Sequence, residues 1–205
     1  MANRNKVVWS EGLFLRTQHL QQQDRHAAWQ LWQALEAMPL QSFGFTKLAL
    51  DPVALETGQI AIAEAQGVMP DGTFFSIPHD TAEIEPVGVV SQSGAGLVHL
   101  AVPAVAADAP QIDPAHAPAS GTRYRGRMVT VRDEIREGSD PVELEVAQLA
   151  PKLLLPEDET RGYATLPIAR LEGLSADGSV LLDAGFLPPA LNTGAVPWYG
   201  RLLKE

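Results

Sequence analysis

The sequence contains no cysteine, which excludes disulfide bonds, thiolate metal sites and cysteine nucleophiles and fits a reducing compartment. It also lacks a long apolar run. The uncharged stretch from Pro86 to Ala107 is interrupted by prolines, glycines and polar residues, so we expect no membrane-spanning helix there. Arg4 and Lys6 are followed by no apolar segment of signal-peptide type. We therefore expect neither direct membrane insertion nor a secretory signal.

Cations are absent from the middle of the chain. The whole chain has 25 acidic and 15 basic residues, which gives a net charge of −10. No lysine or arginine lies between Lys47 and Arg123. Nine carboxylates occupy this acidic block: Asp51, Glu56, Glu64, Asp71, Asp80, Glu83, Glu85, Asp108 and Asp113. Such a block repels a phosphate backbone, so we expect no nucleic-acid binding through it.

Recognisable catalytic motifs are also missing. No glycine-rich phosphate loop follows a predicted strand, and no serine lies in a nucleophile elbow. His19 and His26 share a helix face and could hold a metal, but a polar or partner-contacting surface is the favoured interpretation. His79 and Asp80 are adjacent, so a polar loop pair is favoured over a base with its orienting group. We predict no catalytic, cofactor-binding or metal-binding residues.

Two further clusters have alternative interpretations. Glu143 and Glu145 could form a carboxylate pair, but alternation places them on the solvated face of a strand whose inward face carries Val142, Leu144 and Val146. Basic and aromatic residues are interleaved at positions 123–127, as in a nucleic-acid patch. The negative net charge favours the other interpretation, in which Arg123, Arg125 and Arg127 meet the acidic block of this or a neighbouring chain.

One long helix is predicted near the N-terminus. Apolar residues recur at three- and four-residue steps from Leu20 to Met38, which predicts a helix over about 17–38. Thr17 can cap its start and Pro39 ends it. The preceding arm holds Trp9, Leu13, Phe14 and Leu15, an apolar density that predicts a covered or partner-binding segment.

After Pro39 the pattern changes to short alternating runs bounded by glycine, proline or aspartate. Without a second long helix between strands, this predicts a mainly β protein, an antiparallel β-sandwich with one long N-terminal α-helix. The stretch 104–122 lacks a period and is expected to be a long loop. The predicted strands are 43–50, 59–65, 68–69 with 73–77, 97–102, 123–131, 142–149, 163–171 and 180–182.

Four sequence blocks carry a family resemblance. Residues 6–25 (KVVWSEGLFLRTQHLQQQDR), 69–74 (MPDGTF), 166–171 (LPIARL) and 186–191 (FLPPAL) together resemble the TssK family of type VI secretion baseplate subunits, also called VasE or ImpJ. The resemblance implies a β-sandwich like the shoulder of phage receptor-binding proteins, which a helical neck and a head follow in the family. It divides the chain into an arm and helix packed on the sandwich (1–39), the shoulder sandwich (40–190) and the start of a linker to the neck and head (191–205).

The resemblance also implies a function. It indicates a cytoplasmic, non-enzymatic adaptor that forms homotrimers, binds the TssF–TssG wedge and reaches the TssJ–TssL–TssM membrane complex only through the head. A carbohydrate- or receptor-binding sandwich is the alternative, and a sandwich hydrolase or metal enzyme is a third class. The residues expected at the partner interface are Trp9, Leu13, Phe14, Leu15, His19, Leu20, Gln22, Gln23 and Arg25.

Overall fold

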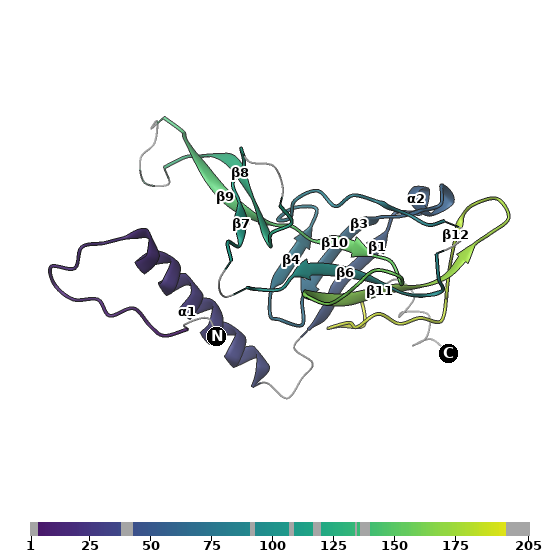
Figure 1. Ribbon diagram of the computed structural model, residues 1–205, viewed down its shortest axis with the longest axis horizontal. Coiled ribbons are helices and arrows are strands. Elements are labelled where there is room, and N and C mark those ends of the chain that lie inside the picture. The colour runs from purple at the N-terminus through teal and green to yellow at the C-terminus, as the bar shows by residue number, and fades with distance from the viewer. Residues whose placement is uncertain are drawn as a thin grey trace.

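The structure is a computed structural model that describes residues 4–37, 43–90, 93–106, 109–116, 120–133, 135 and 140–195. Its elements follow one another in the order α1 (Thr17–Glu36), β1 (Gly44–Leu50), α2 (Pro52–Glu56), β2 (Gln59–Ile60), β3 (Ile62–Val68), β4 (Phe74–Ile77), β5 (Val87–Gly88), β6 (Gly96–Pro103), β7 (Ile112–Asp113), β8 (Tyr124–Val131), β9 (Val142–Leu149), β10 (Lys152–Leu154), β11 (Tyr163–Leu174) and β12 (Val180–Leu182). The predicted mainly β class with one long N-terminal helix is confirmed (Figure 1).

Two antiparallel sheets enclose the core. One has the strand order β1-β3-β4 and the other the order β10-β6-β11-β12. Phe45 of β1 and Phe75 of β4 meet edge to face, with ring centroids 5.8 Å apart, a favourable aromatic geometry. Leu100 of β6 and Leu166 of β11 are fully buried beside them. Burial does not alternate strictly, because β4 and β6 each bury three consecutive residues, as expected of strands covered on both sides.

The end of the described chain closes this sandwich. Ala190 forms a parallel bridge with Phe45, and the Leu191 N–H donates to the Phe45 carbonyl. The Leu48 N–H donates to the carbonyl of Ala195, whose side chain is buried in the core. Residues 191–195, which were expected to begin the linker, therefore contact the sandwich, and residues 196–205 of the expected linker lie outside the described residues.

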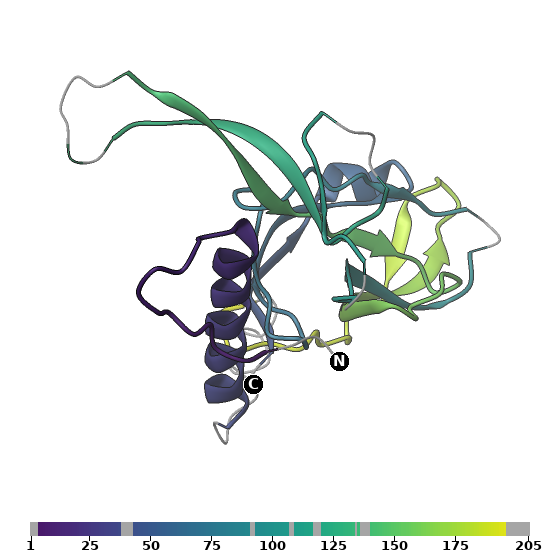
Figure 2. The same ribbon diagram turned by 60° about the vertical axis from the view of Figure 1, so that its left-hand side comes forward.

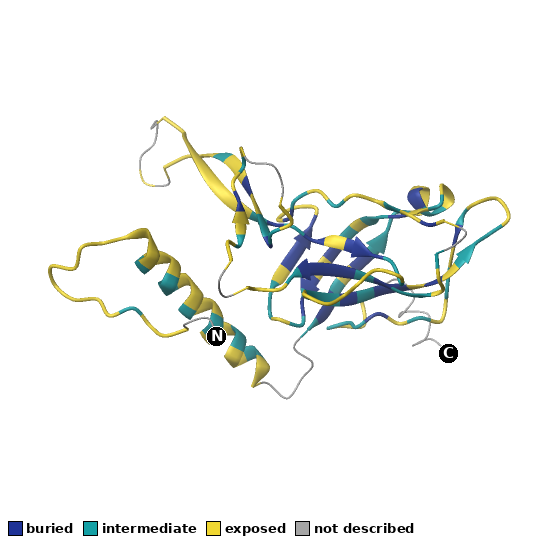
Figure 3. Cartoon of the chain, viewed as in Figure 1, coloured by how far each residue is buried: buried dark blue, intermediate teal, exposed yellow. Residues whose placement is uncertain are grey.

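A third sheet leaves the sandwich. Strands β7, β8 and β9 form a ribbon that projects away from the two main sheets, as Figures 1 and 2 show from two sides. The strand β7 lies within the stretch 104–122 that was expected to be loop, and it pairs in parallel with β8. Most residues of β9 are exposed, which Figure 3 shows as a yellow ribbon against the dark blue core.

The long helix lies beside the sandwich. No residue of α1 is buried, but the Trp32 ring lies against Gly72 in the turn between β3 and β4. Among the described residues, no helix is long and apolar enough to cross a membrane. The predicted helix end at Met38 lies outside the described residues.

Three short elements were not predicted: α2, β7 and β10. For α2 a signal was present, because Asp51 precedes Pro52. The Asp51 carboxylate accepts hydrogen bonds from the N–H groups of Val53 and Ala54, and proline suits the first helical position.

Candidate functional site

The start of α1 is fixed by its own first turn. Arg16 is the N-cap, and its N–H donates to Nδ1 of His19 over 3.1 Å. The His19 N–H in turn donates to the Arg16 carbonyl over 2.9 Å, so each residue satisfies a backbone group of the other. Thr17 was expected to cap the helix, and this was wrong: Thr17 is the first helical residue, because the reciprocal pair places the cap one residue earlier.

The N-terminal arm folds back along the helix. Nε2 of Gln22 donates to the Asn5 carbonyl over 2.7 Å, and Nδ1 of His26 lies 2.8 Å from the Arg4 carbonyl. These contacts join the first described residues to the second and third turns of α1. Nδ1 of both His19 and His26 thus contacts a backbone group, and the described residues contain no group of three His, Asp or Glu side chains placed to hold a metal ion.

The middle of the arm makes a turn that returns the chain to the helix start. The Leu13 N–H donates to the Ser10 carbonyl over 3.2 Å, and Gly12 within this turn has a φ of +79°, which glycine adopts without strain. Trp9 lies near His19, with ring centroids 6.3 Å apart. The arm is thereby a closed loop held at its start by α1 and at its end by the helix cap.

The loop presents its apolar side chains to solvent. Phe14 is 80% exposed and Val8 is 81% exposed, whereas monomeric proteins cover most side chains of this size. Trp9, Leu15 and Leu20 are also exposed. A contiguous exposed aromatic and aliphatic segment is typical of a protein-binding surface.

All nine predicted interface residues lie on this arm and the first half of α1. Six of them are exposed: Trp9, Leu13, Phe14, Leu15, Leu20 and Arg25. His19, Gln22 and Gln23 are half-buried, and two of these hold the arm and the helix cap through the contacts described above. The structure thus brings the nine together, and their binding role stays a prediction.

A second exposed apolar surface was missed. Val142, Leu144 and Val146 were expected to point into the core, and this was wrong: they are 59%, 48% and 37% exposed, respectively. The reason is that β9 belongs to the projecting ribbon, where no layer formed by the described residues covers the side that carries Val142, Leu144 and Val146. Alternation in a sequence identifies a two-faced strand but not whether a layer lies over its apolar face.

The root of this ribbon is held by a buried arginine. Arg123 is 2% exposed and forms an ion pair of 2.7 Å with Asp71, which belongs to the acidic block. Its guanidinium also donates to the Pro103 carbonyl and to the Thr73 hydroxyl. The expectation that these arginines meet the acidic block is confirmed for Arg123.

The next two arginines differ from the first. Arg125 and Arg127 are exposed, and within the described part of the chain neither has an ion-pair partner. Arg123 points inward although it shares the alternating positions of the other two, because it precedes β8 and lies where the chain leaves the sandwich.

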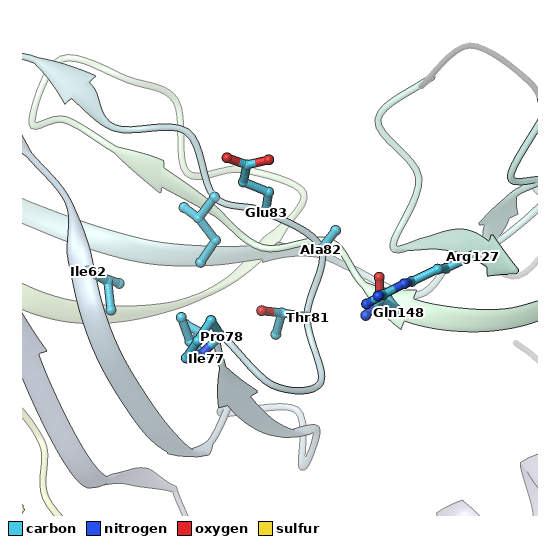
Figure 4. Close-up of a pocket in the computed structure, with 9 residues that line it drawn as sticks. Ile62, Ile77, Pro78, Thr81, Ala82, Glu83, Arg127 and Gln148 are labelled. Atoms are coloured by element: carbon cyan, nitrogen blue, oxygen red, sulfur yellow. The ribbon is translucent and has the colours of Figure 1, made fainter. Parts of the chain in front are cut away.

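An open groove of about 460 Å³ lies between this root and the sandwich (Figure 4). Ile62, Ile77 and Pro78 form part of its apolar wall, while Arg127 and Gln148 of the ribbon close the other side. Oγ1 of Thr81 is buried there without a hydrogen-bond partner. The groove therefore joins the base of the exposed ribbon face to the sandwich edge.

Titratable groups with shifted pKa values lie apart from one another. Partial burial lowers the pKa of His99, which keeps this imidazole neutral inside β6. Hydrogen bonds from Ser120 lower the pKa of Asp113. Neither group faces a second shifted group, so within the described residues no acid–base pair is assembled.

Known proteins share this arrangement. The model of a bacterial type VI secretion family that includes EvfL, ImpJ and VasE matches residues 19–205. The type VI secretion system baseplate component TssK1 of Pseudomonas aeruginosa is 34% identical over 205 residues, which are 100% of this chain and 46% of that protein. The chain thus spans about half the length of this curated relative.

Solved structures agree. A crystal structure of TssK superposes with a TM-score of 0.90 at 28% identity and covers 98% of this chain and 46% of that one. A TssK–TssF–TssG baseplate subcomplex of the type VI secretion system, seen by cryo-electron microscopy, contains a chain with a TM-score of 0.78 at 25% identity, covering 94% of this chain and 64% of that one. The family resemblance read from the four sequence blocks is confirmed, and the chain belongs to the bacterial type VI secretion family of EvfL, ImpJ and VasE.

Proposed function

We propose that this chain is the shoulder portion of a type VI baseplate adaptor and binds a TssF–TssG wedge through its N-terminal arm. The single observation that carries the proposal is the closed arm loop, whose apolar side chains are exposed while its backbone is fixed to α1. The relative of known structure in a TssK–TssF–TssG subcomplex supplies the identity of the partners. The role is structural, cytoplasmic and non-enzymatic.

In this proposal Trp9 and Phe14 are the anchors of the interface. Aromatic side chains dominate the energetics of protein interfaces because they bury a large area at a low cost in conformational entropy. Leu13, Leu15 and Leu20 extend the apolar patch, and Arg25 supplies part of its polar rim. Gln22 and His19 act on the loop itself, because their contacts hold its shape before a partner arrives.

We further propose that copies of the chain associate as a homotrimer, as the family resemblance implies. The link to a TssJ–TssL–TssM membrane complex is assigned to neck and head segments of the family and to none of these 205 residues. The wedge-binding arm and the self-association are separate proposals, because the first rests on the arm and the second on other surfaces of the chain.

The arm is tested by the double substitution Trp9→Ala with Phe14→Ala. Both side chains are exposed, so the variant is expected to fold as the wild type does and to lose co-purification with TssF and TssG. A matched control is Val105→Ala with Leu181→Ala, which also truncates two exposed apolar side chains, both away from the arm. Undiminished co-purification of the arm variant, or equal loss in the control, would overturn the placement.

A further inference from the structure

The hairpin of β8 and β9 has two unlike faces. In an antiparallel pair, residues directly opposite each other point to the same side. One side carries Met128 and Thr130 opposite Glu145 and Glu143. The other side, which we call the aliphatic face, holds five aliphatic residues followed by arginines at the root: Val129, Val131, Val142, Leu144 and Val146, then Arg125 and Arg127.

None of the described residues covers the distal part of this face. Val131 and Val142, which pair with each other, are 42% and 59% exposed, and the ribbon extends away from the sandwich in both views (Figures 1 and 2). A two-stranded ribbon is marginal in water unless one face is packed. The distal part of the aliphatic face is therefore available to another chain, as far as the described residues go.

The charges around the aliphatic face indicate what kind of chain would cover it. Arg125 and Arg127 at the root of the aliphatic face are exposed cations that lack an ion-pair partner within the described residues. The same chain displays exposed carboxylates in its acidic block, and Arg123 already pairs with one of them, Asp71. A second copy of the chain therefore offers the complementary charge that its own arginines lack.

The complementary surface lies at the other end of the molecule. The helix α2 and the segment around β5 are joined through the pairing of β2 with β5 and through the bond from the Val89 N–H to the Gly58 carbonyl, 2.8 Å long. This α2–β5 end exposes Val53 and Val90, 66% and 58% exposed, beside the exposed carboxylates Glu56 and Glu85. It thus combines exposed aliphatic groups with negative charge, as the hairpin combines them with positive charge.

We propose that the aliphatic face of the β8–β9 hairpin docks on the α2–β5 end of a second copy of this chain. In Figure 1 the hairpin projects to the upper left of the sandwich and α2 lies on its right-hand side, so the contact is head-to-tail and each copy still offers one free hairpin and one free α2–β5 end. Contacts of this kind close into rings when the rotation between copies permits. The inference rests on the self-association proposed above and names the surfaces that produce it.

The test measures solution mass by light scattering over a range of concentrations. The wild-type chain is expected at a multiple of 22.0 kDa. Val131→Lys with Leu144→Lys places charge on the aliphatic face beside Arg127, and is expected to raise the dissociation constant at least about 100-fold, as for two central interface residues. The matched control Met128→Lys with Thr130→Lys changes the opposite face, where Glu145 and Glu143 receive the lysines, and is expected to keep the wild-type mass.

A mixing experiment identifies the second surface. Val53→Lys with Val90→Lys is expected to dissociate the assembly as the hairpin variant does. Mixed together, the two variants retain one intact hairpin and one intact α2–β5 end, so they are expected to form a 1:1 dimer of twice 22.0 kDa. No other pairing of the two variants offers both intact surfaces.

The outcomes separate the two proposals. A wild-type chain that stays monomeric overturns both the self-association and the docking surface. A wild-type multimer that the hairpin variant leaves intact overturns the docking surface alone, and so does a mixture that forms no dimer. None of these results bears on the arm, whose readout is co-purification with TssF and TssG.

Discussion

Arg123 connects three parts of the chain that are distant in sequence. Its guanidinium contacts the turn between β3 and β4 through Asp71 and Thr73, and the end of β6 through Pro103. The side chain is 2% exposed, whereas that of Asp71 is 30% exposed. The ribbon root is therefore fixed to both main sheets by one side chain. Because this side chain is buried, water would not replace its hydrogen bonds if it were removed.

We expect Arg123→Met to lower the free energy of unfolding by about 3 kcal/mol, because it strips a partly buried carboxylate and a carbonyl of their donor. Urea unfolding followed by circular dichroism measures the change. Arg125→Met is the control: this arginine is exposed and should change stability by less than about 0.5 kcal/mol. Equal effects in the two variants would show that the buried contacts contribute nothing specific.

Asp177 is the residue with the clearest electrostatic signature. Hydrogen bonds from the hydroxyls of Ser175 and Ser179 lower its pKa from 3.8 to about 2. Because the folded pKa lies below the unfolded one, this contribution to stability is fully present above pH 3.8 and is lost as the pH falls toward 2.

Carboxyl chemical shifts recorded by NMR from pH 1.5 to 6 should therefore place the Asp177 midpoint near 2. Ser175→Ala removes the first of the two donors and should move the midpoint back toward 3.8. Thr57→Ala is the control: it also removes a hydroxyl, but one distant in sequence from Asp177, and should leave the Asp177 midpoint unchanged. A titration midpoint of 3.8 for Asp177 in the wild type would contradict the hydrogen bonds from Ser175 and Ser179.

At the scale of elements, α1 meets the sandwich at a point where a side chain cannot be added. A β-carbon on Gly72 would lie 2.1 Å from Cε3 of Trp32, and Gly72 has a φ of +84°. We expect Gly72→Ala to displace the Trp32 ring and to strain the turn. Hydrogen exchange of α1 amides should then rise, while exchange in β6 and β11 should change little.

The matched control for that prediction is Gly94→Ala, because a β-carbon there meets no atom within 4 Å. It should leave the exchange of α1 unchanged. If α1 exchanges at the wild-type rate in the Gly72 variant as well, the helix is held by contacts other than the Trp32 ring.

Elements with a strong local signal were predictable. The long helix lies within the predicted range of about 17–38, although its cap is Arg16, because its apolar period is helical. The strands β9 and β12 match the predicted 142–149 and 180–182 because alternation and turn residues bound them. The short strand β10 was missed, since three residues carry no period, whereas β5 was expected only as the first of two strands within the uncharged stretch 86–107. Their pairing depends on strands β2 and β6, which lie elsewhere in the sequence.

The two exposed surfaces differ in how far sequence could reveal them. The arm was found because Trp9, Phe14 and their neighbours form a dense apolar segment with no strand or helix pattern. The aliphatic face of the hairpin was not, because Val142, Leu144 and Val146 alternate as buried residues do. Only the three-dimensional arrangement shows that no layer covers them.

At the scale of the whole molecule, charge governs which large partners are accessible. The net charge is −10, and the exposed arginines of the ribbon are too few to offset it. We expect no measurable binding of fluorescent duplex DNA at 0.15 M salt by anisotropy, because phosphate contacts need a cationic surface. Arg125→Ala with Arg127→Ala should not alter this result. Binding that the double variant abolishes would restore the nucleic-acid interpretation of residues 123–127.

The pairing of β1 with the segment Ala190–Ala195 governs when the sandwich can form. Phe45 belongs to β1, the first strand of the described residues, yet two of its backbone bonds and a bond of Leu48 need residues at the far end of the described chain. Contacts of such long sequence separation form late and slow folding. During synthesis β1 can pair with β3 early, but its bonds to Pro189, Leu191 and Ala195 form only after those residues emerge, so the closing of the sandwich is a late step.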